Sequence, residues 1–117
     1  ARAMGSDILS VRRLRALGPE AVAARVPAGA RVYLTIDIDA FCPSIAPGTG
    51  TPSHGGLLYY EGLELLRALA YAHEIVGIDL VEVAPAYDPG ESTQILAAQL
   101  LLNLLGFVFD ARGRGGA

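Results

Sequence analysis

Two aspartates at the end of an apolar run are the residues best suited to chemistry in this sequence. Asp37 and Asp39 alternate with isoleucines in the segment Thr35-Ile36-Asp37-Ile38-Asp39. In a β-strand, side chains two positions apart point to the same face, so both carboxylates could close on one cation. Carboxylate oxygens are hard ligands that suit Mn²⁺, Mg²⁺ or Ca²⁺. The spacing therefore predicts a divalent metal site.

The same spacing is not unique to metal sites. An Asp-x-Asp pair at a strand end occurs in phosphatases and sugar transferases. In a capping turn, Asp39 would cap the irregular segment that follows, and Asp37 would pair with a cation elsewhere in the chain. A buried carboxylate is costly unless it is paired, hydrogen-bonded or bound to metal, and few cationic residues lie nearby in the sequence. That cost favours the metal site over the turn.

The surrounding pattern predicts an α/β arrangement that positions this pair. The β-branched run at 31–39 is typical of a buried strand in a parallel sheet. Apolar residues at helical spacing over 59–73 predict an amphipathic crossover helix, and 75–83 predicts a second strand parallel to the first. Between the first strand and the crossover helix, residues 40–58 are rich in Pro, Gly, Ser and Thr, which favours a long functional loop at the rim of a pocket. Two more helices are predicted, at 18–26 and at 93–105, the latter capped by Ser92 and ended by Gly106.

Parallel strands bring further acidic residues to the same place. Ligands of open α/β sheets bind beyond the carboxyl ends of the strands, so Asp37, Asp39 and Glu82 are expected to converge on one edge. Such convergence favours a cation or a cationic ligand, although Glu82 could instead contact a surface arginine. Asp79, inside the second strand, could orient a metal-binding histidine supplied from outside this chain.

Three segments follow one another in a characteristic order: Thr-Ile-Asp-Ile-Asp-Ala-Phe-Cys-Pro (35–43), Ala-Pro-Gly-Thr-Gly-Thr-Pro (46–52) and Gly-Ile-Asp-Leu-Val-Glu-Val-Ala-Pro (77–85). In this order they resemble the C-terminal portion of the ureohydrolase family, which comprises arginases, agmatinases and formimidoylglutamases. The resemblance runs from about residue 32 to residue 106. Pro-Gly-Thr-Gly and Glu-Val-Ala-Pro are nearer to agmatinase-like members than to arginase.

The resemblance implies part of a parallel-sheet, three-layer arginase-like α/β fold. It also implies binuclear, manganese-dependent hydrolysis of a guanidino or amidine compound, agmatine-like, to an amine and urea. By the same resemblance Asp37 matches the aspartate that bridges both Mn²⁺ ions and Asp39 the aspartate that binds one. Thr51 and Glu82 match positions in the substrate pocket, with Glu82 facing the guanidinium. Cys42 stands where the family has aspartate, which bears on the groups that support the metal ligands.

The family's upstream metal ligands are a histidine after a glycine-rich strand end and an Asp-Ala-His-x-Asp run. Neither occurs in this sequence, and His54 and His73 do not match them. We therefore expect residues 1–117 to be one α/β domain that is the C-terminal fragment of a larger ureohydrolase-like domain. We expect it to have a flexible tail at 111–117 and to be incomplete and inactive in isolation.

Two alternative functions stay open. The first is a non-catalytic truncated remnant or subunit that keeps the fold and pairs with other chains. The second is a haloacid-dehalogenase-like phosphotransferase, whose aspartyl nucleophile also lies in an Asp-x-Asp after an apolar strand. That enzyme needs a later lysine, and this sequence has none after the pair.

Composition narrows the class of partner. A net charge of -3 disfavours binding to nucleic acid, and 52% hydrophobic residues indicate a globular chain. The longest apolar stretch, 95–109, is interrupted by Gln99, Asn103 and Gly106, which favours a buried helix over a membrane span. The single cysteine excludes an internal disulfide. We expect a small guanidino substrate, no nucleic-acid or membrane partner, a cytoplasmic location, and a homo-oligomer for the complete enzyme.

Overall fold

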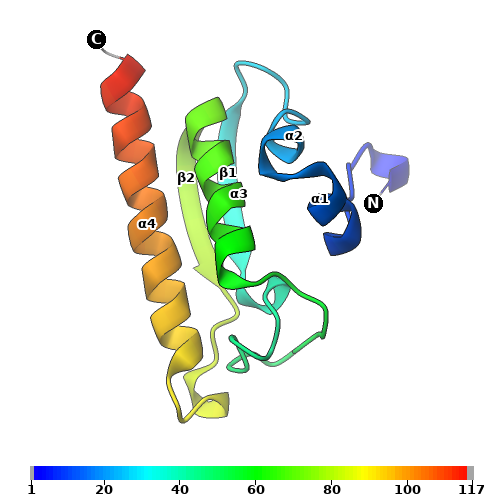
Figure 1. The fold of residues 1–117 in the computed structure, drawn as a ribbon, viewed down its shortest axis with the longest axis vertical. Coiled ribbons are helices and arrows are strands. Elements are labelled where there is room, and N and C mark those ends of the chain that lie inside the picture. Colours follow the sequence, from blue (N-terminus) through cyan, green and yellow to red (C-terminus); the bar gives the residue numbers. More distant parts are fainter. Residues whose placement is uncertain (1, 116–117) are drawn as a thin grey trace.

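Residues 2–115 are described by the computed structural model of this chain (Figure 1). Its helices and strands are α1 (Val11–Leu17), α2 (Pro19–Ala23), β1 (Arg31–Asp37), α3 (Tyr59–Ala72), β2 (Glu74–Val81) and α4 (Ser92–Gly115). Short 3-10 turns lie at Arg2–Met4, Ile38–Ala40 and Pro85–Tyr87.

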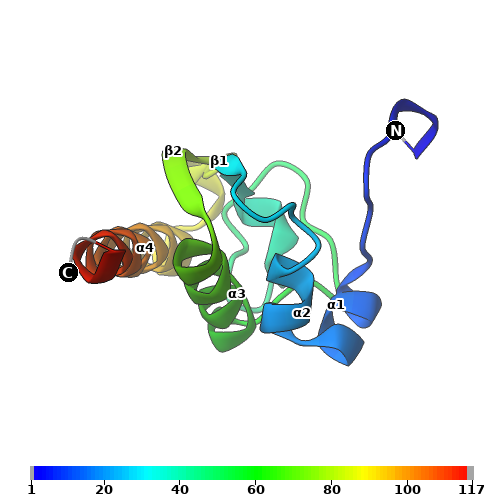
Figure 2. The same ribbon diagram turned by 90° about the horizontal axis from the view of Figure 1, so that it is seen from above.

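The two strands form a parallel sheet, and α3 is the crossover between them. Their pairing runs from Arg31 opposite Glu74 to Asp37 opposite Val81, with one irregularity after Val32. Figure 2 shows α3 and α4 on the same face of the sheet, while no helix within residues 2–115 covers the other face. The predicted α/β class with a parallel sheet is therefore confirmed, and the described part contains one helix layer packed on that sheet.

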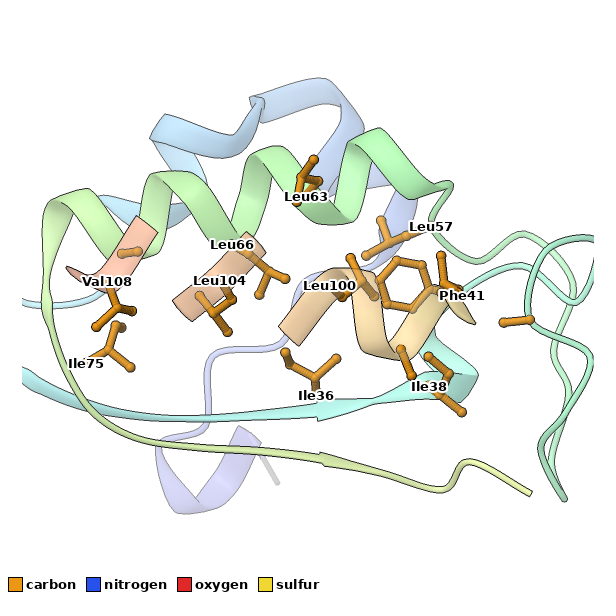
Figure 3. Close-up of a cluster of buried hydrophobic side chains, with 14 residues drawn as sticks. Ile36, Ile38, Phe41, Leu57, Leu63, Leu66, Ile75, Leu100, Leu104 and Val108 are labelled. Atoms are coloured by element: carbon orange, nitrogen blue, oxygen red, sulfur yellow. The ribbon is translucent and has the colours of Figure 1, made fainter. Parts of the chain in front are cut away.

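Alternation along β1 builds the core between the sheet and its helices. Ile36 of β1 is buried, Val32 and Leu34 from the same strand pack against the core cluster, and Ile38, in the 3-10 turn after the strand, is buried with them. Figure 3 shows Ile36 and Ile38 facing buried side chains of α3 and α4. The main helical contributors are Leu63 and Leu66 from α3, and Leu96, Leu100, Leu104 and Val108 from α4.

The last helix is longer than the sequence predicts. Instead of ending at Gly106, α4 continues to Gly115, so the predicted tail at 111–117 is helical as far as the described residues reach; residues 116 and 117 lie outside them. A glycine inside a helix costs only about 1 kcal/mol, which tertiary packing can offset. Here Val108 is buried beside Ile75, and the Arg112 guanidinium donates to the Ile75 carbonyl at 2.8 Å.

By length and composition alone, α4 could also cross a membrane. Core helices meet the same criterion, and every third or fourth residue of α4 enters the core described above. Its packing therefore agrees with the predicted buried helix.

The N-terminal region also differs from the prediction. The helix expected at 18–26 is short, Pro19–Ala23, and an additional helix, α1, precedes it. The Ser10 side chain caps α1 by accepting from the Arg13 amide at 3.2 Å, so a serine at the N-cap was the signal for this helix. Gly18, with φ of 82°, separates the two helices, because that backbone conformation favours glycine.

Candidate functional site

Parallel pairing brings the predicted acidic residues to one edge of the sheet. Asp37, the last residue of β1, lies opposite Val81, the last residue of β2. Glu82 follows directly, so it leaves the same edge as Asp37. Its φ of 65° is rare for a residue with a side chain and is found mostly where the surrounding structure enforces it. The backbone thus holds Glu82 in an unusual conformation at the carboxyl end of the sheet.

Asp39 does not continue the strand, contrary to the prediction of a strand over 31–39. The backbone turns into a 3-10 helix at Ile38–Ala40, and the Asp37 side chain caps that turn by accepting from the Asp39 amide at 3.1 Å. The local hydrogen bond competes with strand pairing, as short acidic side chains often do. The two carboxylates are therefore close because of the turn, not because of strand alternation.

Thr51 belongs to the same group. Its hydroxyl donates to Oδ2 of Asp39 at 2.7 Å, across twelve positions of sequence. Asp37, Asp39 and Thr51 thus form one chain of hydrogen bonds, and the structure brings together three of the predicted site residues. The hydroxyl that donates to Asp39 fixes the orientation of that carboxylate.

Each aspartate keeps one oxygen for a ligand. Within residues 2–115, Oδ2 of Asp37 and Oδ1 of Asp39 accept no hydrogen bond, and neither residue forms a salt bridge. Carboxylate oxygens without a hydrogen-bond donor are the kind of ligand that a hard divalent cation takes. A group of three or more acidic, histidine or cysteine ligands is not found among the described residues, so these two residues could supply only part of a coordination shell.

Glu82 is linked to this group through the loop rather than by its side chain. The Ala84 amide donates to the Gly48 carbonyl at 2.7 Å, which joins the segment after β2 to the turn that leads to Thr51. A small apolar cavity of about 150 Å³ between β1 and α3 also reaches Asp37. Larger cavities of about 510 Å³ lie elsewhere, beside α1 and α2.

Asp79 faces the side of the sheet that no described helix covers. It accepts hydrogen bonds from the hydroxyls of Tyr33, at 3.0 Å, and Thr35 on the neighbouring strand. The bond to Asp79 raises the pKa of Tyr33, because the charged carboxylate stabilises the protonated phenol. Its predicted role, orienting a histidine from outside the chain, stays a prediction.

Other candidates from the sequence lie away from the aspartates or serve packing. His54 is exposed in the loop. His73 lies at the opposite end of the sheet, where its Nε2 donates to the Ala23 carbonyl at 2.8 Å. Cys42 is partly buried, and hydrogen bonding with Ser44 lowers the pKa of its thiol.

Sequence reasoning missed a buried polar pair beside this site. Asp88 and Thr93 are 5% and 0% exposed and hydrogen-bond to each other, and the Thr93 hydroxyl also accepts from the Gly48 amide. The signal in the sequence was an Asp-Pro-Gly turn followed by Ser-Thr at the start of an apolar helix. The predicted cap at Ser92 is wrong: its hydroxyl donates to the Ile45 carbonyl at 2.9 Å, and Asp88 accepts from the Thr93 amide at 2.7 Å.

Comparison with known proteins places these features in a family. A sequence model of the arginase family matches residues 1–106. The agmatinase of Chromobacterium violaceum is 43% identical over 105 residues, which are 87% of this chain and 32% of that protein. The agmatinase of Halalkalibacterium halodurans is 52% identical over 79 residues, which are 67% of this chain and 27% of that protein.

Solved structures agree with the sequence comparison. A hypothetical agmatinase from Burkholderia thailandensis matches 97% of this chain with a TM-score of 0.83 and 38% identity. The proclavaminate amidino hydrolase of Streptomyces clavuligerus matches 95% with a TM-score of 0.85 and 38% identity. The chain covers 36% and 37% of those two structures, so it spans little more than a third of either.

Proposed function

The chain belongs to the arginase family, and we propose that it supplies part of the active site of an agmatinase-like ureohydrolase. The reaction is hydrolysis of a guanidino or amidine compound, agmatine or a close analogue, to an amine and urea. The observation that carries the proposal is the group of Asp37, Asp39 and Thr51 at the carboxyl end of β1, with Glu82 leaving the same edge from β2.

Manganese fits this group as far as the chain provides it. Asp37 and Asp39 would hold the ions with their free oxygens, and further ligands would come from outside these residues. When bound, Mn²⁺ supplies Lewis acidity that lowers the pKa of a coordinated water, which makes that water a nucleophile at neutral pH. Asp37 matches the position shared between two ions, so its loss should cost more metal than the loss of Asp39.

The remaining roles belong to this chain's own side chains. Glu82 would accept the paired N–H donors of a planar guanidinium, so that its charge both orients the substrate and rejects neutral ureas. Thr51 fixes one oxygen of Asp39 and leaves the other free for the cation. Because Thr51 lies in the loop that the sequence predicts at the rim of a pocket, we expect it to connect the metal-binding group with the substrate-binding one.

The test uses a completed enzyme, in which this chain replaces the matching third of the Chromobacterium violaceum agmatinase. With Mn²⁺ we expect urea release from agmatine, guanidinobutyrate or a related guanidine. Asp37→Ala should lose more bound metal and more activity than Asp39→Ala. If Asp39→Ala loses both ions while Asp37→Ala retains them, the assigned roles are reversed. If neither variant changes metal content, the metal site is elsewhere.

Glu82 can be tested separately from the metal ligands. Glu82→Gln keeps the size but removes the charge, and should lower kcat/KM by roughly a hundredfold with both ions still bound, the effect of losing one charge-assisted contact. Glu91→Gln is a matched control, because Glu91 also has a positive φ, 62°, and is exposed. Metal loss in Glu82→Gln would make Glu82 a ligand, and unchanged kinetics would remove it from the site.

The alternative is a subunit or remnant that keeps the fold without catalysis. Its support is the two-carboxylate group itself, since no set of three or more potential ligands forms within residues 2–115. Metal sites rarely preform without their full ligand set. We therefore expect the 117-residue chain alone to bind Mn²⁺ weakly and to release no urea. A completed enzyme with wild-type manganese content but no turnover on any guanidine would favour this alternative.

A further inference from the structure

A buried acidic group lies behind the proposed site and takes no part in it directly. Oδ2 of Asp88 accepts two hydrogen bonds from Thr93, one from the backbone amide and one from the hydroxyl, both at 2.7 Å. Among the described residues Asp88 has no cationic partner within salt-bridge distance. Its burial is therefore compensated only by hydrogen bonds, which makes their arrangement specific.

The charge of Asp88 fixes the direction of the next hydrogen bond. An ionised carboxylate only accepts, so the Thr93 hydroxyl must donate its proton to Asp88 and present a lone pair elsewhere. That lone pair accepts the Gly48 amide at 2.7 Å. The Gly48 N–H, the Thr93 hydroxyl and the Asp88 carboxylate thus form a continuous series of hydrogen bonds in the interior, each polarising the next.

Gly48 connects this series of hydrogen bonds to the two segments that carry Thr51 and Glu82. Its carbonyl accepts from the Ala84 amide at 2.7 Å, two residues after Glu82. Thr51 follows Gly48 by three residues along the loop, and its hydroxyl donates to Asp39. The Gly48 peptide unit is therefore held on one side by Thr93 and on the other by the strand end that carries Glu82.

The contact is close enough to exclude any side chain at this position. A Cβ at Gly48 would lie 2.8 Å from the Thr93 hydroxyl oxygen and 2.9 Å from Cβ of Asp88. Contacts below 3.0 Å require something to move, and both neighbours are buried and bonded to each other. The turn at residues 47–51 is thus packed directly onto the start of α4.

We propose that Asp88 and Thr93 are positioning residues that set the relative placement of Thr51 and Glu82 through Gly48. The inference rests on the proposed function for the identity of those two substrate-binding residues. Neither Asp88 nor Thr93 touches the metal-binding carboxylates, so their loss should impair substrate binding before it impairs metal binding. A cap that only stabilised α4 would change stability and leave the KM for substrate unmoved.

Two variants at one position separate the two roles. Thr93→Val keeps the shape of the side chain and the backbone amide bond to Asp88, but it removes both the hydroxyl donor to Asp88 and the acceptor for Gly48. Thr93→Ser keeps the hydroxyl and serves as the conservative rescue. Both are made in the completed enzyme, and each is characterised by manganese content, by KM and kcat for agmatine, and by hydrogen exchange of peptides covering residues 47–51 and 82–84.

For Thr93→Val we expect unchanged manganese content, a KM about ten- to thirtyfold higher and kcat changed less than KM, as for two lost buried hydrogen bonds. Exchange in both peptides should be about tenfold faster than in the wild-type enzyme. Thr93→Ser should restore KM and exchange to within about twofold of wild type.

The outcomes separate this inference from the proposed function. If the wild-type completed enzyme releases no urea from any guanidine, the proposed function fails, and the exchange measurement alone decides whether Thr93 holds the two segments. If the enzyme is active but Thr93→Val matches Thr93→Ser in KM and in exchange, the positioning role is overturned. A fall in melting temperature with unchanged KM and exchange would overturn it too, and would leave Asp88 and Thr93 as a helix cap.

Discussion

Gly48 offers the sharpest test of how the loop is packed, because the same turn contains its own control. An alanine Cβ at Gly48 would lie 2.8 Å from Oγ1 of Thr93, 2.9 Å from Cβ of Asp88 and 3.0 Å from Cβ of Thr93. At Gly50 the same addition would meet no atom within 4 Å, and the backbone there is not in the left-handed region. Gly48→Ala and Gly50→Ala therefore differ in packing, not in chemistry.

The expected magnitude follows from the neighbours. Extra atoms in a tightly packed interior cost about 1 to 3 kcal/mol, and a shifted turn would also lose the bond from the Gly48 amide to Thr93, about 1 kcal/mol. We therefore expect Gly48→Ala to lower the free energy of unfolding by about 2 to 4 kcal/mol. At about 4 °C per kcal/mol for a chain of this length, the melting temperature should fall by roughly 8 to 16 °C. Gly50→Ala should stay within about 0.5 kcal/mol of wild type or stabilise slightly.

Urea unfolding of the 117-residue chain, followed by circular dichroism, measures both variants. A double variant with Thr93→Ala removes the nearest clashing atom, so the combined loss should be smaller than the sum of the two single losses. A Gly48→Ala variant within about 0.5 kcal/mol of wild type would contradict this packing. Equal destabilisation by Gly50→Ala, or strict additivity in the double variant, would contradict it as well.

Three further predictions concern titratable groups. The Arg15 guanidinium donates to both oxygens of Glu61 and lowers the pKa of that carboxyl, so Arg15→Met should return the Glu61 pKa toward its ordinary value in an NMR titration; an unchanged pKa would contradict the pairing. Because this pKa is lowered on folding, the stabilisation is complete above about pH 4.3 and is lost as the pH falls through the lowered value. Hydrogen bonding with Ser44 lowers the pKa of Cys42, so its iodoacetamide reaction should reach half its maximal rate below about pH 8.5, the midpoint of a free thiol, and a midpoint above that value would count against it. The amide and hydroxyl of Thr93 lower the pKa of Asp88, so the stability that this carboxylate contributes is lost as the pH falls below about 3.9. The urea concentration at the unfolding midpoint should therefore fall with pH in this range more for wild type than for Asp88→Asn; parallel plots of midpoint against pH would show that Asp88 is not involved.

The part of the site that follows from strand direction could be predicted from the sequence. Parallel strands joined by a crossover helix necessarily end at the same edge, so Asp37 and Glu82 had to lie together once both strands were identified. The burial of Ile36 on the helix-covered face follows equally from alternation, whereas Ile38 is buried from the 3-10 turn that follows the strand. These are properties of regular backbone, which periodicity reveals.

The turns and loop contacts that depend on side-chain hydrogen bonds could not be predicted from periodicity. Asp37 ends β1 by capping a turn, so Asp39 reaches the site through a 3-10 helix rather than along a strand. The bond from Thr51 to Asp39 spans a loop whose path no periodicity describes. The α4 helix passes through Gly106 because core packing outweighs a local preference, which a sequence window cannot weigh.

The cationic side chains of this chain lie mostly away from the carboxyl edge in the sequence. All nine cationic side chains of the sequence are arginines, and only Arg67 lies between residues 32 and 111. The salt bridges of the described residues use Asp7, Glu20, Glu61, Glu64, Glu74 and Asp110.

Asp37, Asp39 and Glu82 are absent from every one of those pairs, although they share one edge of the sheet. Asp37 and Asp39 are half-buried and Glu82 is exposed, so what a ligand could offset at this edge is like charge rather than burial. A guanidinium substrate and divalent ions carry the opposite charge and the geometry to bind such groups. The salt bridges of the described residues thus lie away from the carboxyl edge, whose acidic groups take part in none of them.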